Sequence, residues 1–354
     1  MATSKDLPPL DVGFGSIFVK NQFRTKPQYP PSTTDLTGKV ALITGANTGL
    51  GYEAGKQMLA LRLSHLIIAV RSKEKGDAAA SKLRSLYPKA KVEVMIVDMS
   101  KYNSVQEFVR NVDSKLYRLD IAILNAGVIK LKHATEPSTG HEQILQVNYL
   151  STVLLAILLL PILKKKSPPG TPGRLTVVNA ALALTAPLPK PDHGHESIFA
   201  TLDDPKSFVP NTDKTYNMSK FLGQMFAYKL GEYVSADDVV VNFVCPGYVR
   251  GTDLGREASV LIRPAVALFA AVAGRSTRDG ASTYLDAALV KGKESHCSFI
   301  MSWKVSPFNS FLYTPEGKDT ADQVFEETMK ELEFADARGI LESMKTSAVV
   351  FRGQ

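Results

Sequence analysis

The chain of 354 residues carries 42 Lys and Arg against 35 Asp and Glu, a formal net charge of +7, and 44% of its residues are hydrophobic. These proportions are close to globular averages, so they exclude a disordered, collagen-like or coiled-coil chain. The basic residues are scattered apart from one short run at 164–166, so we expect no nucleic-acid partner. Two cysteines are too few for a disulfide scaffold or a zinc site, which fits a reducing cytoplasm and predicts no bound metal.

The first 37 residues are predicted to form an N-terminal arm. Prolines favour an extended segment, and four apolar side chains could pack the arm onto the body. The prolines are Pro27, Pro30 and Pro31, and the apolar residues are Phe14, Ile17, Phe18 and Phe23. The arm has no continuous apolar core, so we expect no secretory signal.

From residue 38 onward, apolar strand patterns alternate with helical ones. Strands that are apolar on both faces and alternate with helices predict a parallel sheet covered on both sides. We therefore expect an α/β fold of the doubly wound Rossmann type, with one domain over 38–354 that ends in a C-terminal lid and tail. The segments 183–214 and 255–275 are expected to flank a substrate cleft at the carboxyl ends of the strands. Predicted strands are 39–43, 66–70, 92–97, 121–124, 175–178 and 239–244, and predicted helices include 49–62, 73–86 and 104–116.

The most apolar stretch, Val153 to Leu160, is followed by Pro161. A membrane span needs about twenty apolar residues. This shorter stretch therefore predicts a buried helix that the proline ends, and no transmembrane segment.

The first strand leads into a glycine-rich turn and then a helix. The turn reads Thr44-Gly-Ala-Asn-Thr-Gly-Leu-Gly51. Glycines allow a pyrophosphate to approach the backbone closely, and the helix N-terminus offers free N–H groups to phosphates. This placement predicts a dinucleotide site that includes Gly45, Asn47, Thr48, Gly49, Leu50 and Gly51.

Basic residues follow the second strand, where a dinucleotide fold meets the adenosine ribose. An acidic residue there favours NAD, whereas Arg accommodates the 2′-phosphate of NADP. Here the residues are Arg71 and, further on, Lys75. Guanidinium can bind phosphate with two hydrogen bonds, so Arg71 is the better candidate and NADP(H) the expected cofactor.

Two further strand ends offer cofactor contacts. Asp98 could accept a hydrogen bond from the adenine amino group, with Met99 lining the ring, although Asp98 could instead only cap the next helix. The small residues of Asn125-Ala126-Gly127 would let the backbone lie close to a ribose.

Taken together, the motifs resemble the short-chain dehydrogenase/reductase family over about residues 36–255. They are the glycine-rich turn, Asn125-Ala-Gly127, Tyr216-Asn-Met-Ser-Lys220 and Pro246-Gly247, in the family's order and spacing. The arm and the Arg after strand two look most like retinol-dehydrogenase-like members and their fungal relatives in secondary metabolism. The resemblance implies an NADP-dependent oxidoreductase acting on an alcohol or carbonyl group (EC 1.1.1.-).

The resemblance also implies roles for single residues. Tyr216 would be the general acid or base, and Lys220, one helical turn away, would lower its pKa and hold the nicotinamide ribose. Asn148 would help to anchor a water for the proton relay. Pro246, Gly247, Val249 and Thr252 would surround the nicotinamide carboxamide, with the threonine one place later than in the commonest pattern.

The sequence departs from the family at the end of the strand 175–178. The family has a Ser-Ser pair there, whose second serine donates a hydrogen bond to the substrate carbonyl. Here Asn179 and Ala180 occupy the two places, and a shift by one gives Ala181. Removing one such donor costs about 3–4 kcal/mol of transition-state stabilisation.

Three interpretations follow from this departure. The protein could be a reductase in which Asn179, Thr185, a water or a substrate hydroxyl replaces the donor. It could be a non-redox isomerase, cyclase or dehydratase that binds NADP(H). It could also be a weakly catalytic binding protein that uses the nucleotide structurally.

Apolar residues in the two flanking segments suggest a lipophilic substrate such as a polyketide or terpenoid. They include Leu182, Leu184, Phe199, Phe208, Leu261 and Phe269, and Ala180 and Leu182 are the expected substrate contacts. His193 and His195 are expected to be loop residues. Family members often pair through the helices that hold Asn148 and Tyr216, so a homodimer is a further expectation, although 153–160 is equally compatible with a core helix.

Overall fold

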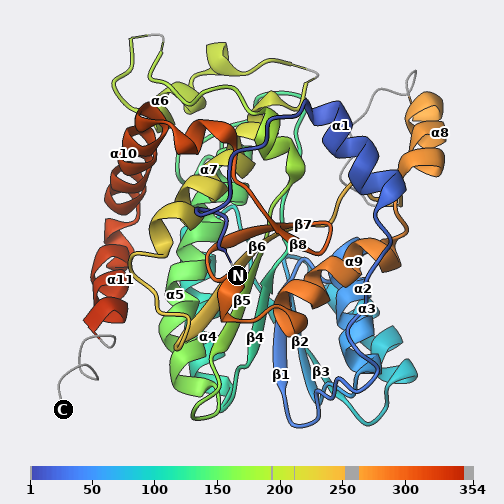
Figure 1. The fold of residues 1–354 in the computed structure, drawn as a ribbon. Helices are drawn as coiled ribbons and strands as arrows, with labels where there is room; N and C mark the ends of the chain where they lie inside the picture. The colour runs from blue at the N-terminus through green and yellow to red at the C-terminus, as the bar shows by residue number, and fades with distance from the viewer. Residues whose placement is uncertain (1, 193, 211, 252–262, 347–354) are drawn as a thin grey trace.

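The computed structural model describes residues 2–192, 194–210, 212–251 and 263–346. An eight-stranded sheet lies at its centre, with strand order β3-β2-β1-β4-β5-β6-β7-β8 (Figure 1). Neighbouring strands are parallel up to β7, and β8 pairs antiparallel with β7. The strands are β1 Val40–Thr44, β2 His65–Val70, β3 Lys91–Ile96, β4 Ile121–Leu124, β5 Gly173–Val178, β6 Val239–Cys245, β7 Ser298–Met301 and β8 Lys304–Ser306. The expected doubly wound α/β fold is confirmed.

Alternate residues of each inner strand are buried on opposite faces of the sheet. In β1, Leu42 belongs to one core with α4, α5, α7, α10 and α11, whereas Ala41 and Ile43 belong to a second core with α2, α3 and α9. Burial on both faces explains why these strands read as continuous apolar runs in the sequence. The helices in these two layers are α2 Gly49–Ala60, α3 Lys73–Leu86, α4 Tyr102–Lys115, α5 Ser151–Lys166, α7 Lys214–Leu230, α9 Thr277–Leu285, α10 Pro315–Glu331 and α11 Ala337–Thr346.

The apolar helix α5 is longer than the sequence suggested. It continues through Pro161 to Lys166, so the expectation that this proline ends the helix was wrong. A π-helical turn, Leu145–Leu150, directly precedes it. Within the described residues, 145–166 is a helix long and apolar enough to cross a membrane, but 89% of its most apolar window is buried inside the protein, as a core helix requires.

The basic run at 164–166 is the last turn of this helix rather than a solvated surface loop. Lys164 lies 2.9 Å from Asp238, and Lys166 lies 3.0 Å from Asp113. Cations at a helix C-terminus also face the negative end of the helix dipole.

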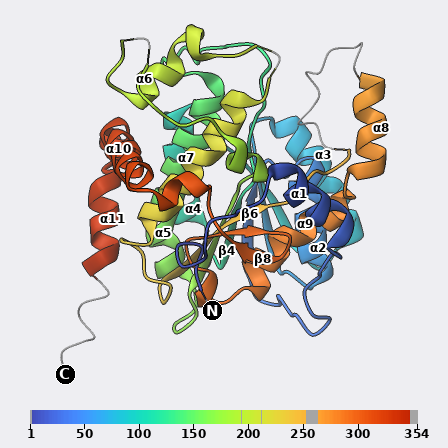
Figure 2. The same cartoon turned by 45° about the horizontal axis from the view of Figure 1, so that its top comes forward.

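The arm and the C-terminal part of the chain meet at one end of the sheet. The arm contains a short helix, α1 (Phe14–Val19), and a π-helical turn, Lys20–Arg24, before an extended segment. Ile17 is buried in the main core, whereas Phe23 is 55% exposed. Figure 2 shows α1 beside the carboxyl end of the sheet, toward α8 (Arg263–Ala273). Two short helical segments of the region 183–214, Ala181–Thr185 and α6 (Ile198–Asp203), lie over α7 and α10.

Candidate functional site

The glycine-rich turn has the geometry that a phosphate cradle needs. Gly45 and Gly49 have φ of +66° and +58°, values that side chains disfavour. A Cβ on Gly51 would lie 2.6 Å from the Asn125 side chain, so that glycine permits close packing of helix against strand. A Cβ on Gly49 would meet no atom within 4 Å, so the start of α2 faces open space. The N-cap residue Thr48 makes no side-chain cap hydrogen bond, which leaves the first N–H groups of α2 available to an anion.

Asn125 connects this turn to the ends of β1 and β4. Its Nδ2 donates to the Thr44 carbonyl oxygen at 2.9 Å, and its own N–H donates to the Thr44 hydroxyl, as does that of Ala126. Its Oδ1 accepts a hydrogen bond of 3.0 Å from the hydroxyl of Tyr284, a fully buried residue of α9. Sequence reasoning missed Thr44 and Tyr284, and no local motif marks the tyrosine.

The basic residues after β2 differ in their engagement. Lys73 is paired with Asp77 one turn along α3, at 2.5 Å. Arg71 is exposed, and no hydrogen bond or ion pair engages its side chain within the part of the chain that the structure describes. Ser72 caps α3 by accepting from the Lys75 N–H, so Lys75 stands in the first turn with its side chain exposed. Arg71 and Lys75 are therefore the cations available to a phosphate.

The strand end at 98–99 is partly committed to local structure. Asp98 Oδ1 accepts from the N–H and hydroxyl of Ser100, as expected of a turn-capping carboxylate. The Met99 side chain is buried in the main core. A contact of Met99 with an adenine ring stays a prediction.

Three predicted catalytic residues converge at the carboxyl ends of β4 and β5. Tyr216 and Lys220 lie one turn apart on α7, with the Lys220 Nζ 5.6 Å from the centre of the Tyr216 ring. Asn148 comes from the π-helical turn before α5 and bonds the backbone of Val128 in both directions, at 2.8 Å each. A Cβ on Gly127 would lie 3.2 Å from Asn148 and 3.8 Å from Lys220, so this glycine gives both side chains room.

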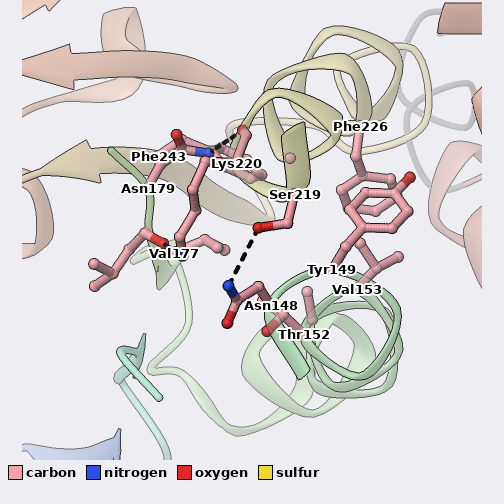
Figure 3. A pocket seen from close by; sticks show the side chains of 13 residues that line it. Asn148, Tyr149, Thr152, Val153, Val177, Asn179, Ser219, Lys220, Phe226 and Phe243 are labelled. Atoms are coloured by element: carbon pink, nitrogen blue, oxygen red, sulfur yellow. Dashed lines mark hydrogen bonds between the residues drawn. The ribbon is translucent and has the colours of Figure 1, made fainter. Parts of the chain in front are cut away.

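Ser219 links Asn148 to the helix of the tyrosine. Asn148 Nδ2 donates to the Ser219 Oγ at 3.2 Å, and that hydroxyl donates to the Tyr216 carbonyl oxygen at 2.7 Å. Figure 3 shows Asn148 and Ser219 reaching toward each other across the space between the two helices. Sequence reasoning missed Ser219, although its place within the Tyr216-to-Lys220 motif was a signal. These residues border a cavity of about 10 Å³, room for about one water molecule.

Burial controls the protonation of the pair. It raises the pKa of the Tyr216 phenol, so the phenol is protonated at neutral pH. Burial also lowers the pKa of Lys220 to about 8. The lysine was expected to lower the pKa of the tyrosine, but here the burial of Tyr216 shifts it the other way.

The structure decides which alanine faces the tyrosine. Ala180 packs in a small apolar cluster with Tyr216, whereas Ala181 packs against the main core. The cluster also contains Leu182, Val128, Ile129, Ile144 and Phe208. Of the other apolar residues expected at the cleft, Phe199 lies in the main core against Tyr149, and Leu261 lies outside the described residues.

The proposed substitutes for the missing serine are engaged elsewhere. Asn179 Nδ2 donates to the Lys220 carbonyl oxygen at 2.9 Å, and Oδ1 accepts from the Ala180 N–H. The Thr185 hydroxyl is exposed and donates to the Leu182 carbonyl oxygen. The hydrogen bonds that these two side chains donate therefore go to backbone oxygens of Lys220 and Leu182.

The Pro246–Val249 loop follows β6 at the same edge of the sheet. The Cys245 thiol accepts hydrogen bonds from the N–H groups of Ala181 and Gly247, which joins the two strand ends. Val249 is buried beside Gly280 of α9. Thr252 lies outside the described residues, as does His193, while His195 lies 3.3 Å from Asp204. No group of His, Cys, Asp and Glu suited to a metal ion occurs among the described residues.

Comparisons with known proteins agree with this geometry. Residues 39–179 match the family model described as short chain dehydrogenase. The chain is 54% identical to the short chain dehydrogenase/reductase mfmJ of Annulohypoxylon moriforme over 98% of this chain and 99% of that protein. It is 42% identical to the short chain dehydrogenase virL of Hypocrea virens, over 93% and 95% of the two chains.

Solved structures show the same fold at low identity. L-sorbose reductase from Gluconobacter frateurii, complexed with NADPH and L-sorbose, superposes with a TM-score of 0.56 at 20% identity, over 76% of this chain and 97% of that one. Salutaridine reductase from Papaver somniferum gives 0.56 at 18% identity, over 74% and 99%.

Proposed function

Because this chain belongs to the short-chain dehydrogenase/reductase family, we propose that it is an NADP(H)-dependent reductase acting on a carbonyl or alcohol group of a lipophilic small molecule. The family places it among oxidoreductases that use a nicotinamide cofactor. The observation that carries the proposal is the position of the Tyr216 phenol, which lies in an apolar cluster next to Lys220, on the helix whose Ser219 accepts a hydrogen bond from Asn148.

Tyr216 acts as the general acid in reduction. A protonated phenol can give its proton to the carbonyl oxygen as negative charge develops there. Bound NADPH would supply the hydride. With a pKa of about 8, Lys220 is mostly charged at neutral pH, so it would stabilise the phenolate that remains and attract a proton back toward it.

Asn148 and Ser219 line a small cavity on the side of Lys220 away from the apolar cluster, where a proton relay could run. The cavity that they border lies between Asn148, Lys220 and the main core, and has room for about one water molecule. A water there could pass a proton taken up from solvent to Lys220, and the lysine would return it to the Tyr216 phenolate.

The residues of the turn and the strand ends fit NADP(H). Gly45, Gly49 and the start of α2 provide a close approach for a pyrophosphate, and Arg71 provides an exposed guanidinium for a 2′-phosphate. We assign the nicotinamide end to Pro246, Gly247 and Val249, and the ribose to Lys220 and the backbone of 125–127.

The apolar cluster supports a lipophilic substrate such as a polyketide or terpenoid. Ala180, Leu182 and Phe208 beside Tyr216 offer contact area and no hydrogen-bond donor. A substrate with several free hydroxyls would lose hydration there without compensation.

The absence of a donor at Ala180 favours one alternative, a non-redox isomerisation, cyclisation or dehydration on the same scaffold. Asn179 and Thr185 are engaged elsewhere, so only a water or a group of the substrate itself could take the serine's place. Acid–base chemistry by Tyr216 would then proceed with NADP(H) bound and unchanged.

The test is Tyr216→Phe with NADPH and a panel of lipophilic ketones and aldehydes. We expect NADPH oxidation to fall about 10²–10⁴-fold, the contribution of a general acid, with NADPH binding retained. Tyr117→Phe is the matched control, because that tyrosine is 87% exposed, between α4 and β4.

Other outcomes separate the alternatives. Substrate consumption that needs Tyr216 but oxidises no NADPH would establish the non-redox enzyme. If the double variant Tyr216→Phe, Lys220→Ala keeps full biological activity, the only interpretation left is a binding protein that uses the nucleotide structurally.

A further inference from the structure

Gln22 of the N-terminal arm reaches into the loop that follows β6. Its Nε2 donates to the carbonyl oxygens of Tyr248 at 2.9 Å and of Ala273 at 2.6 Å. Its Oε1 accepts from the Tyr248 N–H at 3.2 Å. One side chain, more than two hundred residues away in sequence, thus satisfies both backbone groups of Tyr248.

Arg275 holds the same loop from the other side. Its Nη1 donates to the Pro246 carbonyl oxygen at 3.0 Å, and its Nη2 donates to the Asn21 carbonyl oxygen at 2.6 Å. The guanidinium is buried, stacks over Trp303 at 4.7 Å from the ring centre, and also donates to Ser302. The arm and the loop therefore share one fixed cation.

Gly247 lies between these two side chains. Its φ is +82°, and a Cβ there would lie 2.7 Å from both the Gln22 Oε1 and the Arg275 Nη1. Only a glycine fits, so the backbone of the loop is enclosed by the arm on one side and by residue 275 on the other. Two residues further on, Val249 pairs with Arg275 as a β-bridge.

Aromatic packing fixes the arm in this position. The Phe18 ring lies 6.3 Å from that of Tyr248 and 6.0 Å from that of Phe269 in α8, measured between ring centres. Before this segment, the buried Ser4 bonds β7 and β8, and after it Tyr29 bonds Asp279. The arm is attached on both sides of Gln22.

We propose that Gln22 is a positioning residue for the nicotinamide end of the cofactor, acting through the Pro246–Val249 loop. This inference rests on the proposed function, which assigns that loop to the nicotinamide. Without Gln22, the Tyr248 N–H and the Ala273 carbonyl oxygen lose this partner, whereas the Tyr248 carbonyl oxygen keeps its hydrogen bond of 2.8 Å from the Arg275 N–H. The loop then loses its side-chain hydrogen bonds to the arm and can shift relative to it. A displacement of about 1 Å between reacting groups can cost about 10²-fold in rate, so the arm would affect catalysis through the position of the loop.

The test compares Gln22→Met with Asn21→Ala. Methionine keeps the length of the side chain and removes its amide, whereas the Asn21 contribution is a backbone carbonyl that alanine retains. Two ligands are titrated: NADPH, and adenosine 2′,5′-bisphosphate, which carries the 2′-phosphate but no nicotinamide. We expect Gln22→Met to raise the NADPH dissociation constant about tenfold and to lower kcat about 10–100-fold, while binding of the bisphosphate stays unchanged. Asn21→Ala should match the wild type in its NADPH affinity, its kcat and its affinity for the bisphosphate.

Several results would overturn the inference. Unchanged NADPH affinity and kcat in Gln22→Met would show that the loop holds its position without the arm. An equal loss of affinity for NADPH and for the bisphosphate would indicate that the variant is partly unfolded. If Gln22→Met does not fold, Phe18→Leu loosens the packing of the arm on Tyr248 and Phe269, and it must show the same selective loss of affinity for NADPH. Wild-type protein that binds neither ligand contradicts the proposed cofactor, and the comparison is then made with NADH.

Discussion

The ammonium group of Lys220 donates a hydrogen bond of 2.9 Å to the carbonyl oxygen of Val178, the last residue of β5. That carbonyl precedes the two positions where the family has its serine pair. The bond holds a fully buried lysine against the strand end and leaves the side chain within reach of the Tyr216 ring. No carboxylate is among the groups that shift the pKa of this lysine, so its charge is only partly compensated.

Lys220 is predicted to destabilise the cofactor-free protein at neutral pH. Its pKa is about 8 in the folded protein against an ordinary 10.5, so the unfolded chain binds the proton more tightly. Stability should therefore rise as pH increases from about 8 to about 10.5. Lys220→Met should stabilise the protein by about 1–3 kcal/mol at pH 7, as measured by urea unfolding at pH 7 and pH 10.

The exposed Lys214, on the same helix, provides the control for that measurement. Lys214→Met should leave both the stability and its pH dependence as in the wild type. A Lys220→Met protein that is less stable than the wild type at pH 7 would contradict the prediction.

Arg71 is predicted to select NADPH over NADH. A hydrogen bond to a charged group is worth about 1.5–3 kcal/mol, so Arg71→Ala should raise the KM for NADPH about 10–100-fold and leave that for NADH nearly unchanged. Lys73→Ala is the control, because Lys73 is already paired with Asp77. Equal KM values for NADPH in Arg71→Ala and the wild type would show that Arg71 does not bind the 2′-phosphate.

Ala180→Ser is predicted to improve the reduction of simple ketones. A hydroxyl there would lie in the cluster with Tyr216 and could donate to the developing oxyanion, which is worth about 10²–10³-fold in kcat. Ala181→Ser, one residue along, should have no such effect, because Ala181 packs against the main core. If neither serine changes kcat, a substrate group or a water already supplies the missing donor.

The protein is predicted to be a monomer. The resemblance suggested pairing through the helices that hold Asn148 and Tyr216, but α11 of the same chain packs on α5 and α10 packs on α7 (Figures 1 and 2). Light scattering should give a mass near 38.5 kDa. A value of twice this mass would contradict the prediction.

Much of the fold was readable because its strands are buried on both faces and therefore apolar throughout. The predicted helix 73–86 matches α3 residue for residue, and the predicted strand 121–124 matches β4. The helix through Pro161 was missed, since packing of α5 on both sides compensates for the lost backbone hydrogen bond.

The candidate site divides in the same way. Tyr216 and Lys220 could be paired from sequence, because a spacing of four residues places them on one helix face. Two hydrogen bonds of the site join segments that are distant in sequence: Asn148 with Ser219, and Tyr284 with Asn125. The choice between Ala180 and Ala181 depends on where β5 ends. No local pattern encodes them.

Local chemistry thus determined the parallel sheet, the glycine-rich turn and the placement of Tyr216 and Lys220 on one helix face, because each depends on neighbours within one or two turns of chain. Tertiary packing alone decided that burial raises the pKa of Tyr216, that Ala180 lies in the apolar cluster with this tyrosine, and that Gln22 holds the loop after β6. Burial and long-range hydrogen bonds arise only when the arm, the sheet edge and the last helices come together.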